Sequence, residues 1–431
     1  MSRWKMSKQR ITQFVLLLLC PGLLCVPALS QHTLAHARTY SHAIKIPNQE
    51  IPNPVVGASI QAPNNIWYTG MGNTANNYVL IQYWNGTTFQ APAGIPVNSY
   101  IPSDAGQAVL SLSPTDSWVI ANGRTDEAPL QIFHFDGTTR QSFVSPPVKG
   151  AEVNAMAAVN ANDIWAVGSA GPQLHSFTMH WDGTSWQSVD TPEVMPAEDT
   201  DILRGVDAKA ANDVWAVGTQ RDPDGGNSPF ALHWDGTSWS IKSPPDIDDP
   251  HNQLNMSRNG SSLIGHTVGQ SLHSAKRADN PPDLPAAYYR AVAAVSAKNV
   301  WTVGTGGVID HWDGNQWHTV VAPIQSDTLI LNAISAYSSH NIWAVGQKVV
   351  CSVFGICNPV TFIEHWDGCM WRIVPSPSFS FPDGTSTGAL IAVKAFSPNN
   401  VWAVGTTTGN VFLEHWDGHS WQITAQHNVF S

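Results

Sequence analysis

Short apolar segments recur along this chain, and each is followed by residues that favour a turn. The clearest copy runs from Leu203 to Lys242 and reads LRGVDAKA, NDVWAVG, a variable stretch, FALHWDG and TSWSIK. Asn212 and Asp213 separate the first two segments, and Asp235 and Gly236 separate the last two. Such residues favour tight turns, some with positive φ. Each copy therefore predicts a meander of four short antiparallel strands.

A framework of tryptophans repeats this meander seven times. Every tryptophan except Trp4 falls on one of three positions, and the first position holds Trp67, Trp118, Trp165, Trp215, Trp301, Trp343 and Trp402. The second and third positions lie five residues apart, so we expect them to pack across one hairpin and to form contacts between neighbouring repeats. A glycine follows two places after the second position in every copy, namely Gly86, Gly137, Gly183, Gly236, Gly314, Gly368 and Gly418. A two-residue primed turn needs such a residue there.

Seven such copies predict an all-β fold, a seven-bladed β-propeller of four-stranded antiparallel blades. One meander cannot bury both of its faces, so repeats of this length stack around an axis or along a line. Propellers usually carry four to eight blades. We expect the propeller to span 55–431, after a lead segment at 31–54. How the ring closes is open, because 42–46 could add an outer strand to the last blade.

One interval between successive copies is much longer than the others. Within it, Leu254–Gln270 aligns without a gap on Leu331–Gln347, and His266 takes the place of the first tryptophan. No HWDG block follows there. We expect seven blades with an insertion or a degenerate blade at 243–290, and eight blades are the alternative.

The first thirty residues predict a secretory signal peptide. Basic residues precede an apolar run from Phe14 to Leu29, and small residues follow. An uncleaved membrane anchor is the alternative, and no span is expected in the mature chain. Removal of 1–30 takes away four of the 21 basic side chains and none of the 32 acidic ones, which leaves a net charge of −15. This charge argues against nucleic acid as a partner. We expect a monomer that is secreted or held at the cell envelope.

Three cysteines would remain in the mature chain: Cys351, Cys357 and Cys369. An exported chain meets oxidising conditions in which a disulfide bond is expected. A bond between Cys351 and Cys357 would close one loop, and the sequence leaves all three pairings open.

The blocks DVWAVG (Asp213–Gly218) and EHWDGHSW (Glu414–Trp421) resemble the kelch-type propeller repeat. They are also similar to the WAVG/HWDG repeats of uncharacterised secreted bacterial proteins. The resemblance covers Val55–Thr424, and it implies a propeller fold without a particular activity. In the second copy, Ala121 stands where the other copies have the glycine of WAVG.

Antiparallel alternation places the variable connections, from second to third strand and from fourth to first, on one face of the ring. Variable loops on a rigid scaffold normally carry function. The candidate ligand-binding residues there are Arg221, Asp222, Asp224, Asp246, Asp248, Tyr288 and Tyr289. Their structural alternatives are a solvated turn for the first three, a solvated acidic loop for the next two, and core or edge packing for the tyrosines.

The sequence predicts neither a metal site nor a cofactor nor a catalytic residue. Six histidines precede the second aromatic: His134, His180, His233, His311, His365 and His415. Equivalent positions on neighbouring blades are too far apart to share a metal ion, so we expect a repeated hydrogen bond within each blade. No GxSxG or HExxH motif occurs. The leading hypothesis is a secreted, non-enzymatic propeller that binds a protein or a glycan. The alternative is a carbohydrate-active enzyme, a glycoside hydrolase or lyase, with carboxylates on the loop face.

Overall fold

The computed structural model describes residues 55–71, 79–92, 107–123, 128–193, 200–221, 227–242, 288–351, 357–377, 379–380, 386–407 and 410–428. All described residues belong to a single compact unit within 41–431. Within the described ranges the chain forms strands and turns, and no helix there could cross a membrane. The predicted signal peptide, the lead segment and the segment at 243–287 lie outside these ranges.

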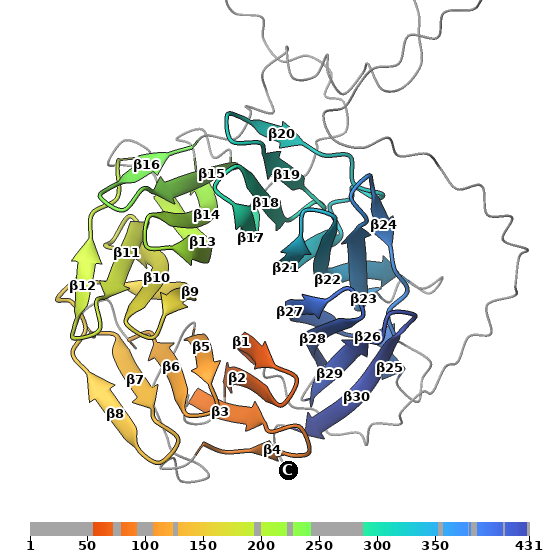
Figure 1. The fold of residues 1–431 in the computed structure, drawn as a ribbon, viewed down its shortest axis with the longest axis horizontal. Helices are drawn as coiled ribbons and strands as arrows, with labels where there is room; N and C mark the ends of the chain where they lie inside the picture. Colours follow the sequence, from red (N-terminus) through yellow and green to blue (C-terminus); the bar gives the residue numbers. More distant parts are fainter. Residues whose placement is uncertain are drawn as a thin grey trace, which may run out of the picture. The chain divides into compact units, whose positions relative to one another are not determined.

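Seven four-stranded antiparallel sheets surround a common centre (Figure 1). The first three are β1 (Val55–Ala62), β2 (Asn65–Met71), β3 (Val79–Trp84) and β4 (Phe89–Gln90); β5 (Gln107–Ser113), β6 (Asp116–Ala121), β7 (Gln131–Phe135) and β8 (Arg140–Phe143); and β9 (Glu152–Asn160), β10 (Asp163–Ala170), β11 (His175–Trp181) and β12 (Trp186–Val189). The next two are β13 (Thr200–Ala210), β14 (Asp213–Arg221), β15 (Asn227–Trp234) and β16 (Trp239–Ile241); and β17 (Tyr289–Ser296), β18 (Asn299–Gly304), β19 (Ile309–Trp312) and β20 (Trp317–Thr319). The last two are β21 (Leu329–Ser338), β22 (Asn341–Cys351), β23 (Cys357–Trp366) and β24 (Trp371–Ile373); and β27 (Ala389–Ser397), β28 (Asn400–Thr407), β29 (Asn410–Trp416) and β30 (Trp421–Asn428). A small hairpin, β25 (Phe379–Ser380) with β26 (Ser386–Thr387), precedes the seventh blade.

Each blade is one continuous piece of chain, and its first strand lies innermost (Figure 1). The ring closes where β1 packs against β27, because one hydrophobic cluster joins Ile60 of blade one to Val404 of blade seven. The last blade takes all four of its strands from 389–428, and residues 42–46 lie outside the described part of the chain. Blade four also packs directly on blade five, where Trp215 and Trp317 share a cluster. The ring therefore has seven blades, and the alternative of eight is wrong.

The tryptophan framework forms the contacts between blades, as predicted. Trp165 of blade three lies between Trp234 and Trp239 of blade four, with ring centroids 4.9 Å and 5.2 Å away. The same arrangement recurs at Trp118, Trp215, Trp301 and Trp343. A buried aromatic side chain removes a large apolar area from water, so this wedge accounts for much of the stability between blades.

The turn between the third and fourth strands follows one design in every blade. Gly236 has a φ of 98°, and all seven glycines at this position have positive φ, which confirms the prediction. Asp235 closes the turn, because its backbone N–H donates to Ser238 O (3.3 Å) while its carboxylate accepts from the N–H groups of Thr237 (2.8 Å) and Ser238 (2.9 Å). The outer hairpins are therefore a uniform frame.

The recurrent histidines also have a structural role. His180 Nε2 lies 2.8 Å from Asp163 Oδ1, and its ring packs on Trp165 with centroids 4.5 Å apart. Equivalent hydrogen bonds join His134, His233, His311 and His415 to an Asp or Asn two residues before the first tryptophan. His365 is the exception, because its Nε2 has no hydrogen-bond partner within the described ranges. The predicted hydrogen bond within each blade is thus confirmed for five of the six histidines.

Candidate functional site

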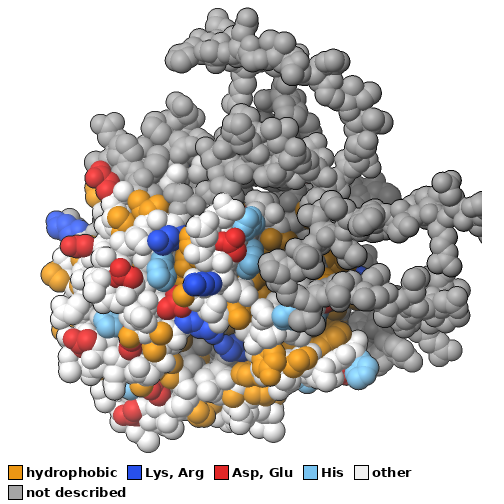
Figure 2. Space-filling model, turned by 45° about the horizontal axis from the view of Figure 1, so that its top comes forward, with side chains coloured by type: hydrophobic (Ala, Val, Ile, Leu, Met, Phe, Trp, Pro, Cys, Tyr) orange, Lys and Arg blue, Asp and Glu red, His pale blue; other side chains and the backbone are white. Residues whose placement is uncertain are grey.

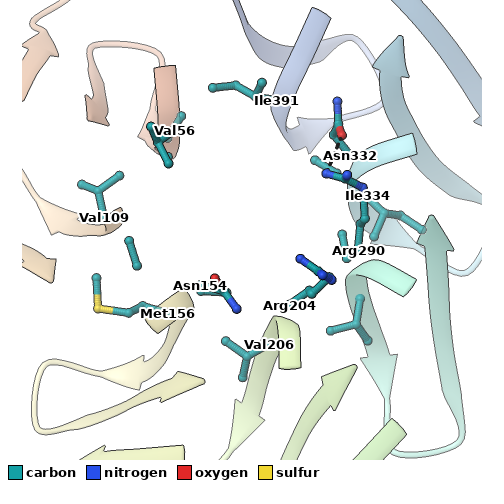
Figure 3. Close-up of a pocket in the computed structure, with 18 residues that line it drawn as sticks. Val56, Val109, Asn154, Met156, Arg204, Val206, Arg290, Asn332, Ile334 and Ile391 are labelled. Atoms are coloured by element: carbon teal, nitrogen blue, oxygen red, sulfur yellow. Dashed lines mark hydrogen bonds between the residues drawn. The ribbon is translucent and has the colours of Figure 1, made fainter. Parts of the chain in front are cut away.

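The innermost strands carry a β-bulge at one recurring position, and this bulge builds the site. In six of the seven blades the register with the second strand shifts by one residue near the beginning of the first strand. The extra residues are Val56, Asn154, Arg204, Arg290, Asn332 and Ile391. A bulge leaves one residue outside the pairing and re-aims its side chain. Here the labelled side chains lie around the central space of the ring (Figure 3).

In blades three to six, the glycine three residues after the first tryptophan leaves room for the bulge. Gly218 pairs with Leu203, and a Cβ atom on Gly218 would lie only 2.0 Å from Ile202 O. The corresponding distances are 1.9 Å at Gly168, 1.6 Å at Gly304 and 1.9 Å at Gly346. The backbone of the first strand can therefore press against the second strand only where no side chain intervenes.

Blade two supplies the natural comparison. Ala121 replaces the glycine there, and it pairs with Gln107. The pairing then continues without a shift from Gln107 through Ser111. The described part of this blade thus has an alanine and no bulge at the position where the other blades have a glycine and a bulge.

A cavity of about 550 Å³ occupies the centre of the ring. Its volume is within the range of about 300–1,000 Å³ that is typical of ligand sites. Four neighbouring blades, three to six, contribute the polar side chains Asn154, Arg204, Arg290 and Asn332 (Figure 3). Blades one, two and seven contribute an apolar wall that includes Val56, Val109 and Ile391. The polar side chains therefore come from one side of the ring, where Met156, Val206, Val292 and Ile334 also line the cavity, and the described lining of the other side is wholly apolar.

The two asparagines join neighbouring blades. Asn154 Nδ2 donates to Leu203 O of blade four (2.8 Å), and Asn332 Nδ2 donates to Leu390 O of blade seven (2.9 Å). Each acceptor carbonyl belongs to the residue just before a bulge. The Oδ1 atom of Asn332 also accepts a hydrogen bond from Arg290 Nη1 (3.4 Å). These amides therefore fix the geometry of the bulges as well as line the cavity.

Arg204 and Arg290 come from adjacent strands that approach closely. Gly205 follows Arg204, and a Cβ atom on Gly205 would lie 2.8 Å from Arg290 O. Both side chains are exposed to the cavity, and protein atoms nevertheless surround them on several sides. This partial burial lowers the pKa of each guanidinium, and the neighbouring Arg204 lowers the pKa of Arg290 further. Both groups remain charged at any physiological pH, because the pKa of arginine starts so high.

Neither arginine forms an ion pair with a residue in the described ranges. The carboxylate on the same strand, Asp207, accepts a hydrogen bond from the backbone N–H of Ala294 (2.7 Å). Burial raises the pKa of Asp207, although this hydrogen bond and the charges of Lys209 and Lys394 partly oppose the effect. Figure 2 shows basic side chains near the middle of the face that it presents, with acidic side chains beside some of them. Arg204 and Arg290 therefore give the cavity a positive charge, although the net charge of the whole chain is −11.

The described part of the cavity offers no acidic, nucleophilic or metal-binding side chains. The described residues that line the cavity include no Asp, Glu, His, Cys, Ser or Thr. Across the described ranges, no three His, Cys, Asp or Glu side chains come close enough together to hold a metal ion.

Of the residues predicted from sequence, Arg221, Tyr288 and Tyr289 are described, and none of them lines the cavity. Arg221 is the last residue of β14, and its side chain is exposed. Tyr288 precedes β17 and donates its backbone N–H to Thr305 Oγ1 (2.9 Å). The remaining four loop candidates, Asp222, Asp224, Asp246 and Asp248, lie outside the described residues. Of these residues, Tyr288 is the one that interacts with a cavity arginine, because its phenol opposes the lowering of the pKa of Arg204 that burial causes.

Tyr289 is a core residue, and the two cysteines beside the β22–β23 loop stabilise a hairpin. The side chain of Tyr289 is fully buried between blades four and five, where its hydroxyl donates to the carboxylate of Asp310. This core position leaves its ring no surface for a sugar. Cys351 and Cys357 form a disulfide bond that joins the ends of β22 and β23.

The sequence reasoning missed the four polar cavity residues, although a signal for them exists. Each bulged residue stands eleven places before the first tryptophan of its blade, as Arg204 does before Trp215 and Arg290 before Trp301. From blade to blade, the residue at this place is Val in blade one and then Asn, Arg, Arg, Asn and Ile in blades three to seven. A position that varies at a fixed distance from an invariant framework of the repeat would have pointed to the cavity.

A scan against protein-family models gave no match, and a search of curated proteins gave none either. Among solved structures, the chain is similar to YCF48 bound to D1 peptide, with 11% identity over 91% of this chain and 99% of that chain and a TM-score of 0.46. It is also similar to YCF48 from Cyanidioschyzon merolae (14% identity, 87% of this chain, 98% of that chain, TM-score 0.48). A third match is the SapL1 lectin in complex with alpha methyl fucoside (15% identity, 77% of this chain, 95% of that chain, TM-score 0.41). At such low identities and TM-scores, the ligands of those proteins are not transferred to this chain, and the propeller assignment rests on its own seven sheets.

Proposed function

We propose that this protein is an exported, non-enzymatic binding module that holds a protein segment or a glycan at the centre of its propeller. The observation that carries the proposal is the set of bulged side chains in the cavity. Six blades use the same bulge, and yet the residue placed in the cavity differs in size and polarity. A repeated frame that presents varied side chains to one cavity is typical of a binding site on a rigid scaffold.

The cavity position agrees with the loop face predicted from the sequence. Arg290 is the second residue of β17, and Asn154 is the third residue of β9. The bulges therefore lie towards the strand ends that receive the connection from the preceding blade. Antiparallel alternation puts the connections between second and third strands on the same face, and Arg221 begins one of them. We propose that Arg221 belongs to the rim around the cavity.

Export, a monomeric state and a kelch-like repeat remain proposals that rest on the sequence. The signal-peptide pattern of residues 1–30 supports export. The WAVG and HWDG blocks support the kelch-like resemblance. The alternative of a carbohydrate-active enzyme depends on Asp246 and Asp248, which lie outside the described residues.

A plug in the cavity tests the proposed site. Val56 is 40% exposed and stands at a bulge on the apolar wall, so the substitution Val56→Trp should project into the cavity and obstruct it without entering the core. Val144→Trp is the matched control, because Val144 is 89% exposed and is not among the cavity residues. We expect the purified mature chain to bind selected members of a glycan and peptide array, V56W to lose this binding, and V144W to keep it. Saturable binding that V56W retains would place the site elsewhere and overturn the proposal.

A further inference from the structure

The adjacent arginines impose a requirement on whatever occupies the cavity. Arg204 and Arg290 carry like charges, and Gly205 allows their strands to approach closely. Like charges that are partly withdrawn from water destabilise each other unless an opposite charge compensates them. Within the described ranges neither arginine has a carboxylate partner, so an anion from outside these ranges would relieve the repulsion.

The hydrogen bonds of the site leave donors free for such an anion. Arg290 donates from Nη1 to Asn332 Oδ1 (3.4 Å), while Asn332 Nδ2 is held by Leu390 O (2.9 Å). This bond orients one edge of the guanidinium, and its other N–H groups have no acceptor within the described ranges. Arg204 has no hydrogen-bond acceptor there, although the phenol of Tyr288 lies close enough to interact with it electrostatically. A planar guanidinium matches a carboxylate through two parallel hydrogen bonds, which a point charge such as an ammonium cannot provide.

The wall opposite the arginines indicates what kind of ligand carries the anionic group. Val56, Val109 and Ile391 present aliphatic side chains there, and no aromatic ring lines the described part of the cavity. A sugar would make poor use of such a wall, because sugars present hydroxyl groups that need hydrogen-bond partners. An aliphatic group would bury apolar surface against it.

Resting on the proposed function of this cavity, we propose that its ligand is a carboxylate carried on an apolar body. Arg204 and Arg290 bind the carboxylate, and the wall of blades one, two and seven contacts the apolar part. The ligand is a small aliphatic acid or the end of a polypeptide whose last residue is apolar, since both present the same chemistry. Long-range attraction is not the driving force, because the whole chain has a net charge of −11 and repels anions.

Isothermal titration of the mature chain with N-acetylleucine tests this inference. N-acetylleucinamide is the matched neutral probe, since it keeps the apolar group and removes the charge. We expect saturable binding of the acid and a loss of about 10- to 100-fold in affinity for the amide, which is the effect of a hydrogen bond to a charged group. Glucuronate, a sugar acid, should bind more weakly than N-acetylleucine. Equal affinity for acid and amide, or tighter binding of glucuronate, would overturn the proposal.

Variants assign the effect to the two arginines. Arg204→Gln and Arg290→Gln should each weaken binding of N-acetylleucine by about 10- to 100-fold and change binding of the amide little. Arg372→Gln is the control, because Arg372 is 60% exposed on the outer strand β24 and makes the same change in total charge. A loss in R372Q as large as in R204Q, or no loss in R204Q and R290Q, would contradict the inference.

Peptides that end in leucine distinguish the two sources of the carboxylate. Tighter binding of a longer peptide with a free end supports a polypeptide chain end, and equal binding supports a small acid. The plug variant V56W separates failure of this inference from failure of the proposed function. If V56W blocks a ligand that binds wild type and R204Q equally, the cavity is a binding site. In that case only the inference that the ligand carries a carboxylate is wrong.

Discussion

A buried glutamate makes the stability of this propeller sensitive to pH. Glu364 is fully buried, and neither of its carboxyl oxygens has a hydrogen-bond partner within the described ranges. It lies on the same face of β23 as Phe362 and Trp366, which pack in the cluster between blades five and six. Burial raises the pKa of Glu364 from the ordinary 4.5 to about 8. The fold therefore holds this carboxyl protonated at neutral pH.

The sign and size of the effect follow from linkage. When the pKa is higher in the folded state, stability is greatest below the unfolded pKa and decreases as pH rises through the folded pKa. The change from 4.5 to about 8 corresponds to roughly 5 kcal/mol at about 1.4 kcal/mol per pH unit. Relaxation of the ionised site and entry of water reduce this figure, so we expect about 3 kcal/mol. Glu414 occupies the equivalent place in blade seven, and burial raises its pKa to about 8 against the opposing hydrogen bond from Ser376.

The substitution Glu364→Gln isolates this contribution, because it keeps the shape and removes the titration. Denaturant unfolding of wild type and E364Q should give similar free energies at about pH 5, and E364Q should be more stable by about 3 kcal/mol at about pH 9. The control is Glu193→Gln, the same substitution at an exposed side chain. A difference between E364Q and wild type that stays the same at both pH values would show that the carboxyl of Glu364 does not couple folding to pH.

Three further perturbations test the frame of the ring. Gly218→Ala should destabilise the fold by about 1–3 kcal/mol in denaturant unfolding, because its Cβ would lie 2.0 Å from Ile202 O; a neutral result would argue against the role of this glycine in the bulge. Trp165→Ala should cost about 3–5 kcal/mol, since it removes the wedge between two tryptophans of the next blade, and a cost near zero would be inconsistent with that wedge. Reduction of the Cys351–Cys357 bond should leave the near-ultraviolet circular dichroism of the tryptophans unchanged, because the bond closes only a short loop; loss of that signal would show that the ring depends on it.

Much of the fold could be predicted because it depends on local patterns repeated seven times. The positive φ of Gly236 and its equivalents follows from a turn within six consecutive residues. The pairing of Trp234 with Trp239 follows from their spacing across that turn. The hydrogen bond of His180 to Asp163 joins neighbouring strands of one blade. Each of these features needs only the geometry of a single meander.

The site could not be predicted in the same way, because it depends on contacts between distant parts of the chain. Arg204 enters the cavity only because Gly218, in the next strand, lets the backbone bulge. Arg290 becomes its neighbour only because blade five packs directly on blade four, across a long interval of sequence. The sequence reasoning instead favoured Asp246 and Asp248, whose acidic cluster is visible without any fold. Closure of the ring, which gathers the bulged residues of six blades, has no local sequence pattern at all.

The most direct test of an axial binding site is the number of ligand molecules bound by each chain. Isothermal titration of the mature chain with N-acetylleucine, or with a tighter peptide ending in leucine, measures this number. A single cavity on the axis predicts one molecule per chain in wild type and none in V56W. Several molecules per chain would indicate sites repeated on the blades, and one molecule that still binds V56W would place the site outside the cavity; either result would contradict the account.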